Sequence, residues 1–460
     1  MKFRIEIKKN RGAVLAYTLV IISITMILLV AIMQFTVSRI EYAKYREIHE
    51  QSLQIAESGI YFYRWYLAHE VEGKTTQQIK DFWENGNPLG VETPYERDLS
   101  DIDGTVRGRY RITVTPPEAY STIVLVETEG WTFRNPDIKR KIQVRFRRPS
   151  WSDLAVLGNA YMRFGNGTTV MGPLHVNGGV HFDGVAYNVV SSSVEQYYDN
   201  DSDVKGWHDG VWTSWANEYN TSMGESVFSG GNEYPVAEKS FANVFTDLSI
   251  IKSTAQNTGT YFGNNGQGRH IILNNNKTFS VRTVATYNTS TNAIATYSGN
   301  WSTLALPDDG VIFVEDNIWL EGKINGNRLT IAAADLVGSV KPSIFIGKDI
   351  LYTSYDGRDI LGIIAQNNIE IVFGSKDVLR LDGALLAQNG RVGRSYYPGD
   401  QKSTITVFGS LASNTRYGFG YTDGTGYAIR NLFYDNNLLY YPPPYFPTGN
   451  AYSIDLWKEI

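Results

Sequence analysis

The chain contains no cysteine among its 460 residues. Neither a disulfide nor a thiolate metal site can therefore form, so packing alone must hold the fold together. Histidine is scarce, with six residues, and none of them falls in the H-E-x-x-H spacing of a zinc protease. The sequence also lacks a G-x-S-x-G elbow and a Walker-type phosphate loop. These absences remove common signatures of hydrolases and nucleotide-dependent enzymes, and we expect neither a cofactor nor a catalytic activity.

Strong charge of one sign is also missing. The formal net charge is −5, from 42 Lys and Arg against 47 Asp and Glu. The basic run Lys139–Arg148 alternates charged with apolar residues, which is typical of a half-buried strand. A nucleic-acid surface would need basic residues gathered on one face. We therefore expect no nucleic-acid partner.

One long uncharged segment, Ala13 to Ser38, is present. As a helix it would be about 39 Å long, which exceeds the roughly 30 Å hydrocarbon core of a bilayer. A secretory signal has only about 7 to 15 apolar residues and ends at a small-x-small cleavage site. No such site follows Val37. We therefore expect residues 13–38 to remain in the mature protein and to bind membrane lipid.

A basic cluster precedes this segment, and one acidic residue, Glu6, opposes it. The basic residues are Lys2, Arg4, Lys8, Lys9 and Arg11. The positive-inside bias predicts a single-pass protein of the cytoplasmic (inner) membrane, with its N-terminus inside and its bulk outside. The helical pattern continues without a proline as far as His69. We expect one helix over residues 13–69, half in lipid and half amphipathic.

Three features occur together in this region: a basic leader ending "NRG", the uncharged run opening at Ala13, and "QIAESGI" at residues 54–60. In this combination the chain resembles the PilX N-terminal group of minor pilins, which belong to type IV pilus assembly. The third feature is similar to the small-acidic-small box of such proteins. Its residues are Ala56, Glu57, Ser58 and Gly59.

The resemblance implies that residues 1–12 are a prepilin-type leader. A prepilin peptidase would cut after Gly12 and leave Ala13 as the new N-terminus. The resemblance also implies that other pilins and the pilus assembly platform are partners. Tyr17 departs from the pattern, because major pilins carry a glutamate five residues after the cut.

Beyond the helix, turn residues and alternating apolar positions divide the chain into regions. Three alternating segments before residue 150 predict an antiparallel meander. Shorter strand-like pieces follow, broken by a long polar stretch without a steady period. The expected regions are a small antiparallel β pilin-like region (70–150), first β-helix rungs (151–193), an irregular insertion (194–305), further rungs (306–416) and a proline-rich C-terminal cap (417–460).

An internal repeat supports the rungs. "GIIAQNN" at residues 362–368 and "GALLAQNG" at residues 383–390 share a core, and "GSLASN" at residues 409–414 repeats it. An interval of about 22 to 25 residues is typical of a β-solenoid, although a β-sandwich with chance similarity is an alternative. The residues expected at equivalent places are Ala365, Gln366, Asn367, Ala387, Gln388, Asn389, Ala412 and Asn414. Their asparagines are expected to stack as a ladder.

Two patterns, one of aspartates and one of histidines, contain residue types that can bind a metal. Asp199, Asp201 and Asp203 occupy odd positions of a calcium loop, but the glycine and the final glutamate of that loop do not follow. We interpret them as a solvated acidic loop. His175 and His181 lie six residues apart, and we interpret them as a pair on the surface of strands. No metal is therefore expected.

The chain is thus predicted to be a long transmembrane α-helix with a mainly-β head, in which a small antiparallel sheet precedes a right-handed parallel β-helix with an insertion. The predicted function is structural: pilus priming or cell adhesion in a type IV pilus-like assembly, with a surface glycan as a further candidate partner. The alternative is a surface-tethered, polysaccharide-active β-helix enzyme. Its candidate residues are Asp356, Asp359, Asp377, Asp382, Arg358 and Arg380.

Overall fold

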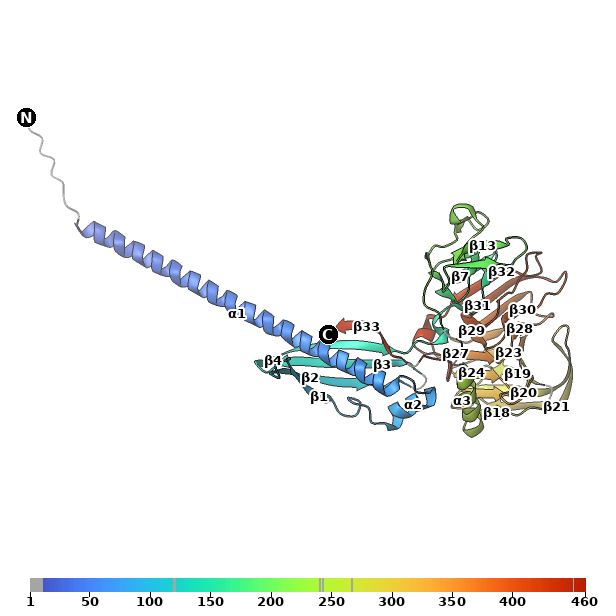
Figure 1. Cartoon of the computed structure of the whole chain (residues 1–460). Helices are drawn as coiled ribbons and strands as arrows, with labels where there is room; N and C mark the ends of the chain where they lie inside the picture. Colours follow the sequence, from blue (N-terminus) through green and yellow to red (C-terminus); the bar gives the residue numbers. More distant parts are fainter. Residues whose placement is uncertain (1–10, 119–120, 240, 242–243, 266–267, 450) are drawn as a thin grey trace, which may run out of the picture.

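The structure is a computed structural model that describes residues 11–118, 121–239, 241, 244–265, 268–449 and 451–460. Most of the predicted leader, residues 1–10, therefore lies outside the described residues. A long helix projects from a mainly-β body, with a small sheet lying between the two (Figure 1). The helix, α1, runs from Arg11 to Val71. Every residue from Ala13 to Glu47 is exposed. Contact with the small sheet begins at Glu47, whose carboxylate lies 4.0 Å from the guanidinium of Arg134.

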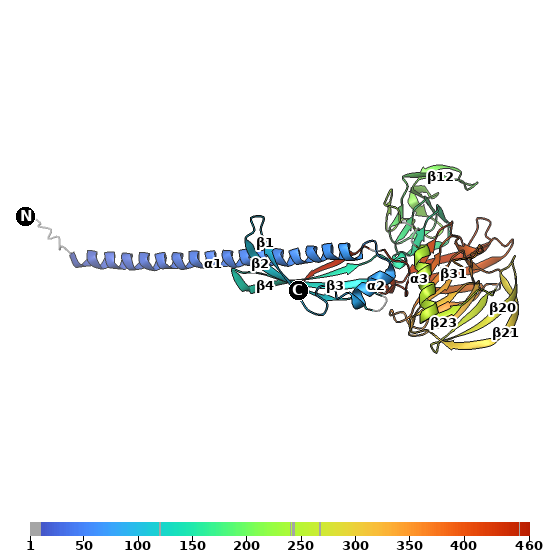
Figure 2. The ribbon, with the colours of Figure 1, turned by 60° about the horizontal axis from the view of Figure 1, so that its bottom comes forward.

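The second half of α1 packs along a five-stranded antiparallel sheet (Figure 2). A short helix, α2 (Thr76–Asn85), follows α1 and begins at a capping box formed by Thr75 and Gln78. The strands in spatial order are β1 (Tyr95–Ser100), β2 (Val106–Thr115), β3 (Ile123–Thr132), β4 (Asn135–Arg147) and β33 (Ser453–Glu459). The last strand comes from the C-terminus of the chain. The small antiparallel sheet expected from the sequence is thus present, with two strands, β1 and β33, more than the three that the sequence indicated.

The larger β body is built from short strands that pair in parallel, in ladders that run through the stack. One ladder consists, in spatial order, of β18 (Thr260–Phe262), β22 (Val311–Val314), β24 (Arg328–Ala333), β27 (Ile360–Ala365), β29 (Val378–Ala387), β31 (Gln401–Ser413), β5 (Val156–Gly158), β8 (Leu174–Val176), β11 (Val190–Ser192) and β17 (Asn232–Glu233). The side chains of its central strands, such as β22, β27, β5 and β8, are mostly apolar and buried, which is why strands of three residues are stable here.

Further ladders flank the first. The second contains β19 (Arg269–Asn274), β23 (Ile318–Ile324), β25 (Ile344–Ile346), β28 (Ile369–Ile371) and β30 (Val392–Arg394). The third contains β26 (Ile350–Tyr352), parts of β29 and β31, β32 (Gly426–Tyr434), β7 (Thr168–Met171) and β10 (Val185–Ala186). Also parallel are β6 (Met162–Phe164), β9 (Val180–Phe182) and β14 (Val211–Trp212).

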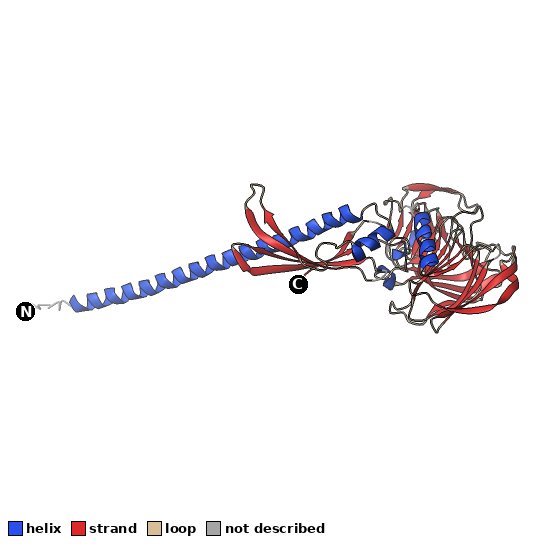
Figure 3. Ribbon diagram, turned by 90° about the horizontal axis from the view of Figure 1, so that it is seen from below, coloured by secondary structure: helices blue, strands red, loops and turns tan. Residues whose placement is uncertain are grey.

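The remaining elements lie at the margins of these ladders, and Figure 3 shows how little helix the body contains. The hairpins are β12 (Gln196–Asp199) with β13 (Gly206–Asp209), β15 (Tyr219–Asn220) with β16 (Glu225–Ser226), and β20 (Thr278–Asn288) with β21 (Ala293–Ala305). The helix α3 (Val244–Asn257) packs against β18 and β22. Short 3₁₀ turns occur at Trp151–Asp153, Ala216–Glu218 and Asn436–Leu439.

The order of strands differs from the order expected from the sequence. Residues 151–193 do not begin the stack, because β5 pairs with β31 through Val156 and Leu411. The chain therefore enters the body near its middle. The region 194–305, expected to be an irregular insertion, supplies β18 and β19 to one end of the ladders, where Ile271 and Leu273 are buried. The expected cap, 417–460, supplies β32 to the body and β33 to the small sheet.

Candidate membrane helix and its docking site

The exposed half of α1 is built for an apolar environment. Within the described part of the chain, α1 is the one helix long and apolar enough to cross a membrane, and none of its apolar stretch is buried in the fold. Four hydroxyl groups in the stretch each donate to a backbone carbonyl one turn earlier. The bonds are Thr18 to Val14 (3.1 Å), Ser23 to Leu19 (2.8 Å), Thr25 to Ile21 (2.9 Å) and Thr36 to Ile32 (2.8 Å). Hydroxyls satisfied in this way can lie in lipid at little cost.

The expected processing residues lie in the first turn of this helix. Gly12 and Ala13 both have helical backbone, and Ala13 is exposed. Further along, Tyr42 and Tyr45 are exposed just beyond the apolar stretch. Tyrosine is enriched at membrane–water interfaces, where its hydroxyl reaches water and its ring reaches lipid. Sequence reasoning did not single these tyrosines out, although their position after the uncharged run was the available signal.

The small-acidic-small motif lies where α1 crosses β3. Ala56 and Gly59 are buried, whereas Glu57 and Ser58 are half-exposed on the side of the helix. The opposing residue is Gly130 of β3. A Cβ placed on Gly130 would lie 2.3 Å from the backbone nitrogen of Ala56, which is closer than any real contact. Helix and strand therefore approach through backbone atoms, and small residues are required on both sides.

Two hydrogen bonds hold this crossing in register. The Oγ1 of Thr128 donates to the carbonyl oxygen of Ala56 at 2.9 Å. The Oγ of Ser52 lies 3.0 Å from the carbonyl oxygen of Ile138, to which it donates. Gly130 and Thr128 were not predicted as site residues, because nothing in the sequence indicates which strand the motif would face. The structure thus gives the motif a clear role in docking the helix onto the sheet.

The repeat residues lie where neighbouring strands pair, with one change of register. Ala365 pairs with Ala387, and both side chains are completely buried. Ala387 in turn pairs with Ser413, so that Ala412 lies one position earlier than the sequence alignment indicated. The cause is the pairing of Gly409 with Gly383, which fixes β31 against β29. Gln366 is buried as well, and its Oε1 accepts a hydrogen bond from the backbone N–H of Asp335 at 2.9 Å.

The expected asparagine ladder has different members. Asn367 donates to Ser343 at 3.2 Å, and Asn389 donates to the carbonyl of Gln366 at 2.8 Å, so these two do not stack on one another. Side-chain amides do stack between the adjoining strands. Asn159 donates to Asn414 at 2.7 Å, and Asn177 donates to Asn159 at 2.9 Å. An asparagine ladder therefore exists, but it consists of Asn414, Asn159 and Asn177, which lie next to the paired strands β31, β5 and β8.

The residues weighed as metal sites have protein partners instead. Asp201 pairs with Arg416, and Asp203 with Arg163 at 2.7 Å. Asp203 is exposed, as expected of a solvated loop, whereas Asp199 is completely buried. Hydrogen bonds from Arg163 lower the pKa of Asp203 to about 2. His175 and His181 are buried and not on the surface as expected, because each forms side-chain hydrogen bonds inside the body. Among the described residues, no group of three or more metal-ligating side chains is arranged to hold an ion.

The carboxylates of the enzyme alternative also have structural partners. Asp359 accepts hydrogen bonds from the backbone N–H groups of Thr353 and Ser354, each at 2.7 Å. Asp382 accepts from the backbone of Tyr352 and pairs with Arg380 at 2.8 Å. Further partners are Ser403 N for Asp377 and Arg358 for Asp356. These bonds hold turns between strands.

Comparison with known proteins adds little to this picture. No family model matches the chain, and no curated protein matches it. Among solved structures, the chain is similar to the crystal structure of the competence-associated pilin ComZ from Thermus thermophilus. The identity is 13%, the TM-score is 0.33, and the match covers 90% of this chain and 97% of that chain. A likeness of this size is too low to assign a fold or a function, so the function must be inferred from the residues themselves.

Proposed function

We propose that the protein is a membrane-anchored, pilin-like structural protein that presents its β body outside the cytoplasmic membrane. The observation that carries this proposal is the exposed half of α1, from Ala13 to Glu47, which is uncharged and mostly apolar up to Ser38. An apolar surface of this length is stable only in lipid or against other helices. The same helix can therefore anchor the protein first and then pack beside other pilins in a fibre.

In this proposal, residues 1–12 are a leader of the PilX-like kind, and a prepilin peptidase removes it after Gly12. The N-terminus lies in the cytoplasm before processing, because basic residues are retained there. The uncut leader would keep five basic residues at an anionic leaflet, each contributing about 1 kcal/mol. Processing releases this attachment, so that the pilus assembly platform can extract the helix.

We further propose that the parallel ladders are the turns of a right-handed β-solenoid, whose role is display. Buried strands such as β27 and β29 make the body self-supporting without disulfides. In this proposal α1, which docks on the small sheet through Ala56 and Gly130, would hold the body beyond the membrane surface. The body would serve pilus priming or cell adhesion at the surface.

Processing of the leader can be tested directly. The chain is co-expressed with a prepilin peptidase, and the membrane-extracted protein is sequenced from its N-terminus. We expect Ala13 as the first residue, and we expect Gly12→Val to keep its leader while it still inserts into the membrane. Gly374→Val is the matched control, since a Cβ there meets nothing within 4 Å. An intact leader on the unmodified chain, in cells that process another pilin, would refute the prepilin assignment.

Association with other pilins needs a separate test. The absence of cysteine makes the chain suitable for cross-linking through a single introduced thiol. Leu28→Cys, in the middle of the exposed helix, should form disulfides with pilins that carry a cysteine at matching depth. Val337→Cys, on an exposed loop of the β body, is the control and should form none. Equal cross-linking at both positions would contradict packing through the helix.

A further inference from the structure

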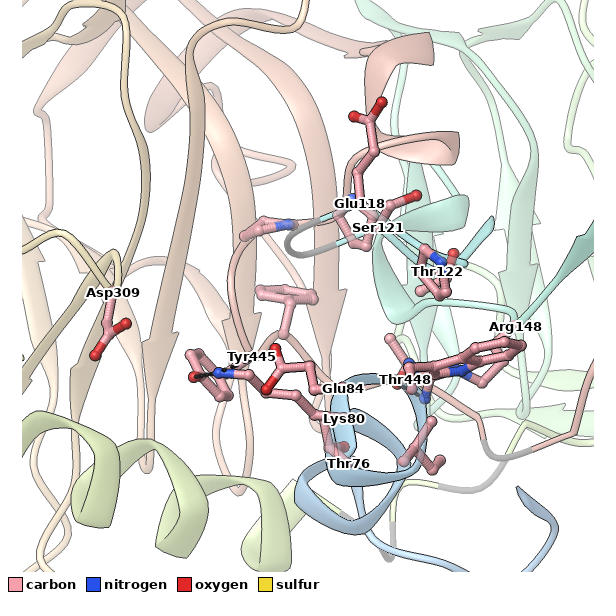
Figure 4. A pocket seen from close by; sticks show the side chains of 16 residues that line it. Thr76, Lys80, Glu84, Glu118, Ser121, Thr122, Arg148, Asp309, Tyr445 and Thr448 are labelled. Carbon is pink, nitrogen blue, oxygen red and sulfur yellow. Dashed lines mark hydrogen bonds and ion pairs between the residues drawn. The ribbon is translucent and has the colours of Figure 1, made fainter. Parts of the chain in front are cut away.

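A pocket lies at the junction between the small sheet and the β body (Figure 4). It has a volume of about 360 Å³, within the range of small-molecule sites. Its walls come from α2 and from the segment that returns from the body to β33. Apolar rings dominate the lining: Trp83, Pro442, Pro443, Tyr445 and Phe446.

One end of the pocket holds a buried guanidinium without a counter-charge. Arg148 is 7% exposed, and its Nη1 donates to Thr448 Oγ1 at 3.0 Å and to the carbonyl oxygen of Gly449 at 3.4 Å. Its Nε has no hydrogen-bond partner. No carboxylate forms an ion pair with Arg148 in the part of the chain that the structure describes. The guanidinium also lies over the ring of Tyr452, 5.8 Å from its centre, which stabilises the cation without neutralising it. An anion at this end of the pocket would supply the missing counter-charge.

The same end carries a second polar group without a partner. Thr122 is 2% exposed, and its Oγ1 forms no hydrogen bond. Figure 4 shows Thr122 beside Arg148, while Asp309 lies at the opposite end of the pocket. The guanidinium of Arg148 thus lies at one end, while Lys80 and the carboxylates of Glu84, Glu118 and Asp309 line the rest of the pocket.

The middle of the pocket combines an ion pair, Lys80 with Glu84, with the aromatic ring of Tyr445. Lys80 donates to the hydroxyl of Tyr445 at 3.3 Å and lies 3.9 Å from the carboxylate of Glu84. Tyr445 has a φ of 55°, a left-handed backbone that a bulky residue rarely adopts. Such conformations persist where the surrounding structure holds a side chain in a functional position. Here the conformation belongs to the residue whose ring lines the pocket.

We propose that this pocket binds a sugar residue that carries one carboxylate. The carboxylate pairs with Arg148, the preferred side chain for a planar anion. The carbon face of the sugar ring packs on Tyr445 and Trp83, and the hydroxyls donate to acidic side chains such as Glu84. The carboxylates in the walls would repel a polyanion such as a polyphosphate, which selects a ligand with a single charge. This assignment goes beyond anchoring and does not depend on it.

Titration calorimetry of the full chain in detergent tests the proposal with three probes: glucuronate, glucose and acetate. We expect glucuronate to bind at least tenfold more tightly than either of the others, because glucose lacks the carboxylate and acetate lacks the ring. Equal affinity for acetate and glucuronate would show that the sugar ring is not recognised. Equal affinity for glucose and glucuronate would show that Arg148 does not bind the carboxylate. Absence of binding by all three would overturn the site.

Variants assign the effect to the pocket. Arg148→Met keeps the packing of the aliphatic stem and removes the charge, so we expect it to lose the preference for glucuronate over glucose. Arg358→Met, on an exposed turn of the β body, is the matched control and should bind as the unmodified chain does. Unchanged selectivity in folded Arg148→Met would refute the proposal. Saturation-transfer NMR on the unmodified chain needs no variant, and it should show the ring protons of glucuronate, rather than those of glucose, receiving magnetisation from the protein.

Discussion

Replacing Gly130 by alanine should weaken the attachment of α1 to the small sheet. The added Cβ would lie 2.3 Å from the nitrogen of Ala56 and 2.5 Å from the carbonyl oxygen of Ser52. Both atoms belong to helix backbone, so no side-chain rotation can relieve the contact. Because non-bonded carbon contacts settle at about 3.5 to 4.0 Å, helix and strand must separate by about 1 Å.

The cost can be worked from the side chains in this interface. Ile55, Ile60, Tyr63 and Leu67 are buried in the shared core. Burial of each contributes about 1.5 to 3 kcal/mol, and a gap of up to about 1 Å loses a quarter or more of the contact energy. The expected destabilisation of the helix–sheet unit is therefore about 2 to 3 kcal/mol, which is also the range typical of an overpacked core.

Hydrogen exchange of residues 48–71 in the full chain measures this loss locally. We expect faster exchange in Gly130→Ala and a melting temperature of the unit lower by about 10 °C. Gly59→Ala should be close to neutral, because its Cβ meets only the side chains of Thr128 and Tyr110 at 3.1 Å and alanine favours the helix. Gly374→Ala is the control with open space. Equal protection in Gly130→Ala and the unmodified chain would refute the close crossing.

Two further predictions concern the β body. Ala365→Asp and Ala387→Asp should each destabilise it by several kcal/mol, because each places an unpaired carboxylate at a completely buried position; thermal unfolding like that of the unmodified chain would show that these positions do not face the interior. The hairpin of β12 and β13 should detach in acid. Hydrogen bonds from Arg163 lower the pKa of Asp203 to about 2, and those from Arg416 lower the pKa of Asp201. Since both folded values lie below the unfolded ones, the unfolded state binds more protons, and this stabilisation is complete above about pH 4 and lost as the pH falls towards 2. Hydrogen exchange of residues 196–209, corrected for intrinsic rates, should show the loss, and Asp203→Asn should reduce it; a flat profile would contradict the ion pairs.

Local patterns were enough to predict the elements at the N-terminus. The uncharged run and the absence of proline predict α1, and strict alternation predicts β2, β3 and β4. Each of these patterns depends only on residues that are close together in the sequence. The repeat around Ala365 and Ala387 likewise predicts two neighbouring strands, because both the spacing and the core recur.

Long-range pairing could not be predicted in the same way. The strand β5 has three residues, and its apolar side chains would fit against many strands. Its actual neighbour, β31, lies far away in the sequence. The asparagine ladder was misassigned for the same reason, since Asn414 follows the register of β5 rather than that of its own repeat. His181 is held inside the body by Asp183, two residues away, and by Ser214, which lies 33 residues away and which no local spacing indicates.

Long-range pairing also explains how the β body is joined to the unit formed by α1 and the small sheet. The chain leaves the small sheet near Ser150 and returns to it near Thr448, and the two crossings pair with one another. Gly449 donates to the carbonyl oxygen of Pro149 at 2.8 Å. A single linker would allow the body to rotate, whereas two paired crossings restrain it. Because β33 follows the body in the sequence, the small sheet gains its fifth strand only after the body has been synthesised. The pairing of β33 with β4 therefore joins the small sheet to the far side of the body in sequence, and an unfolded body would also weaken the edge of the small sheet.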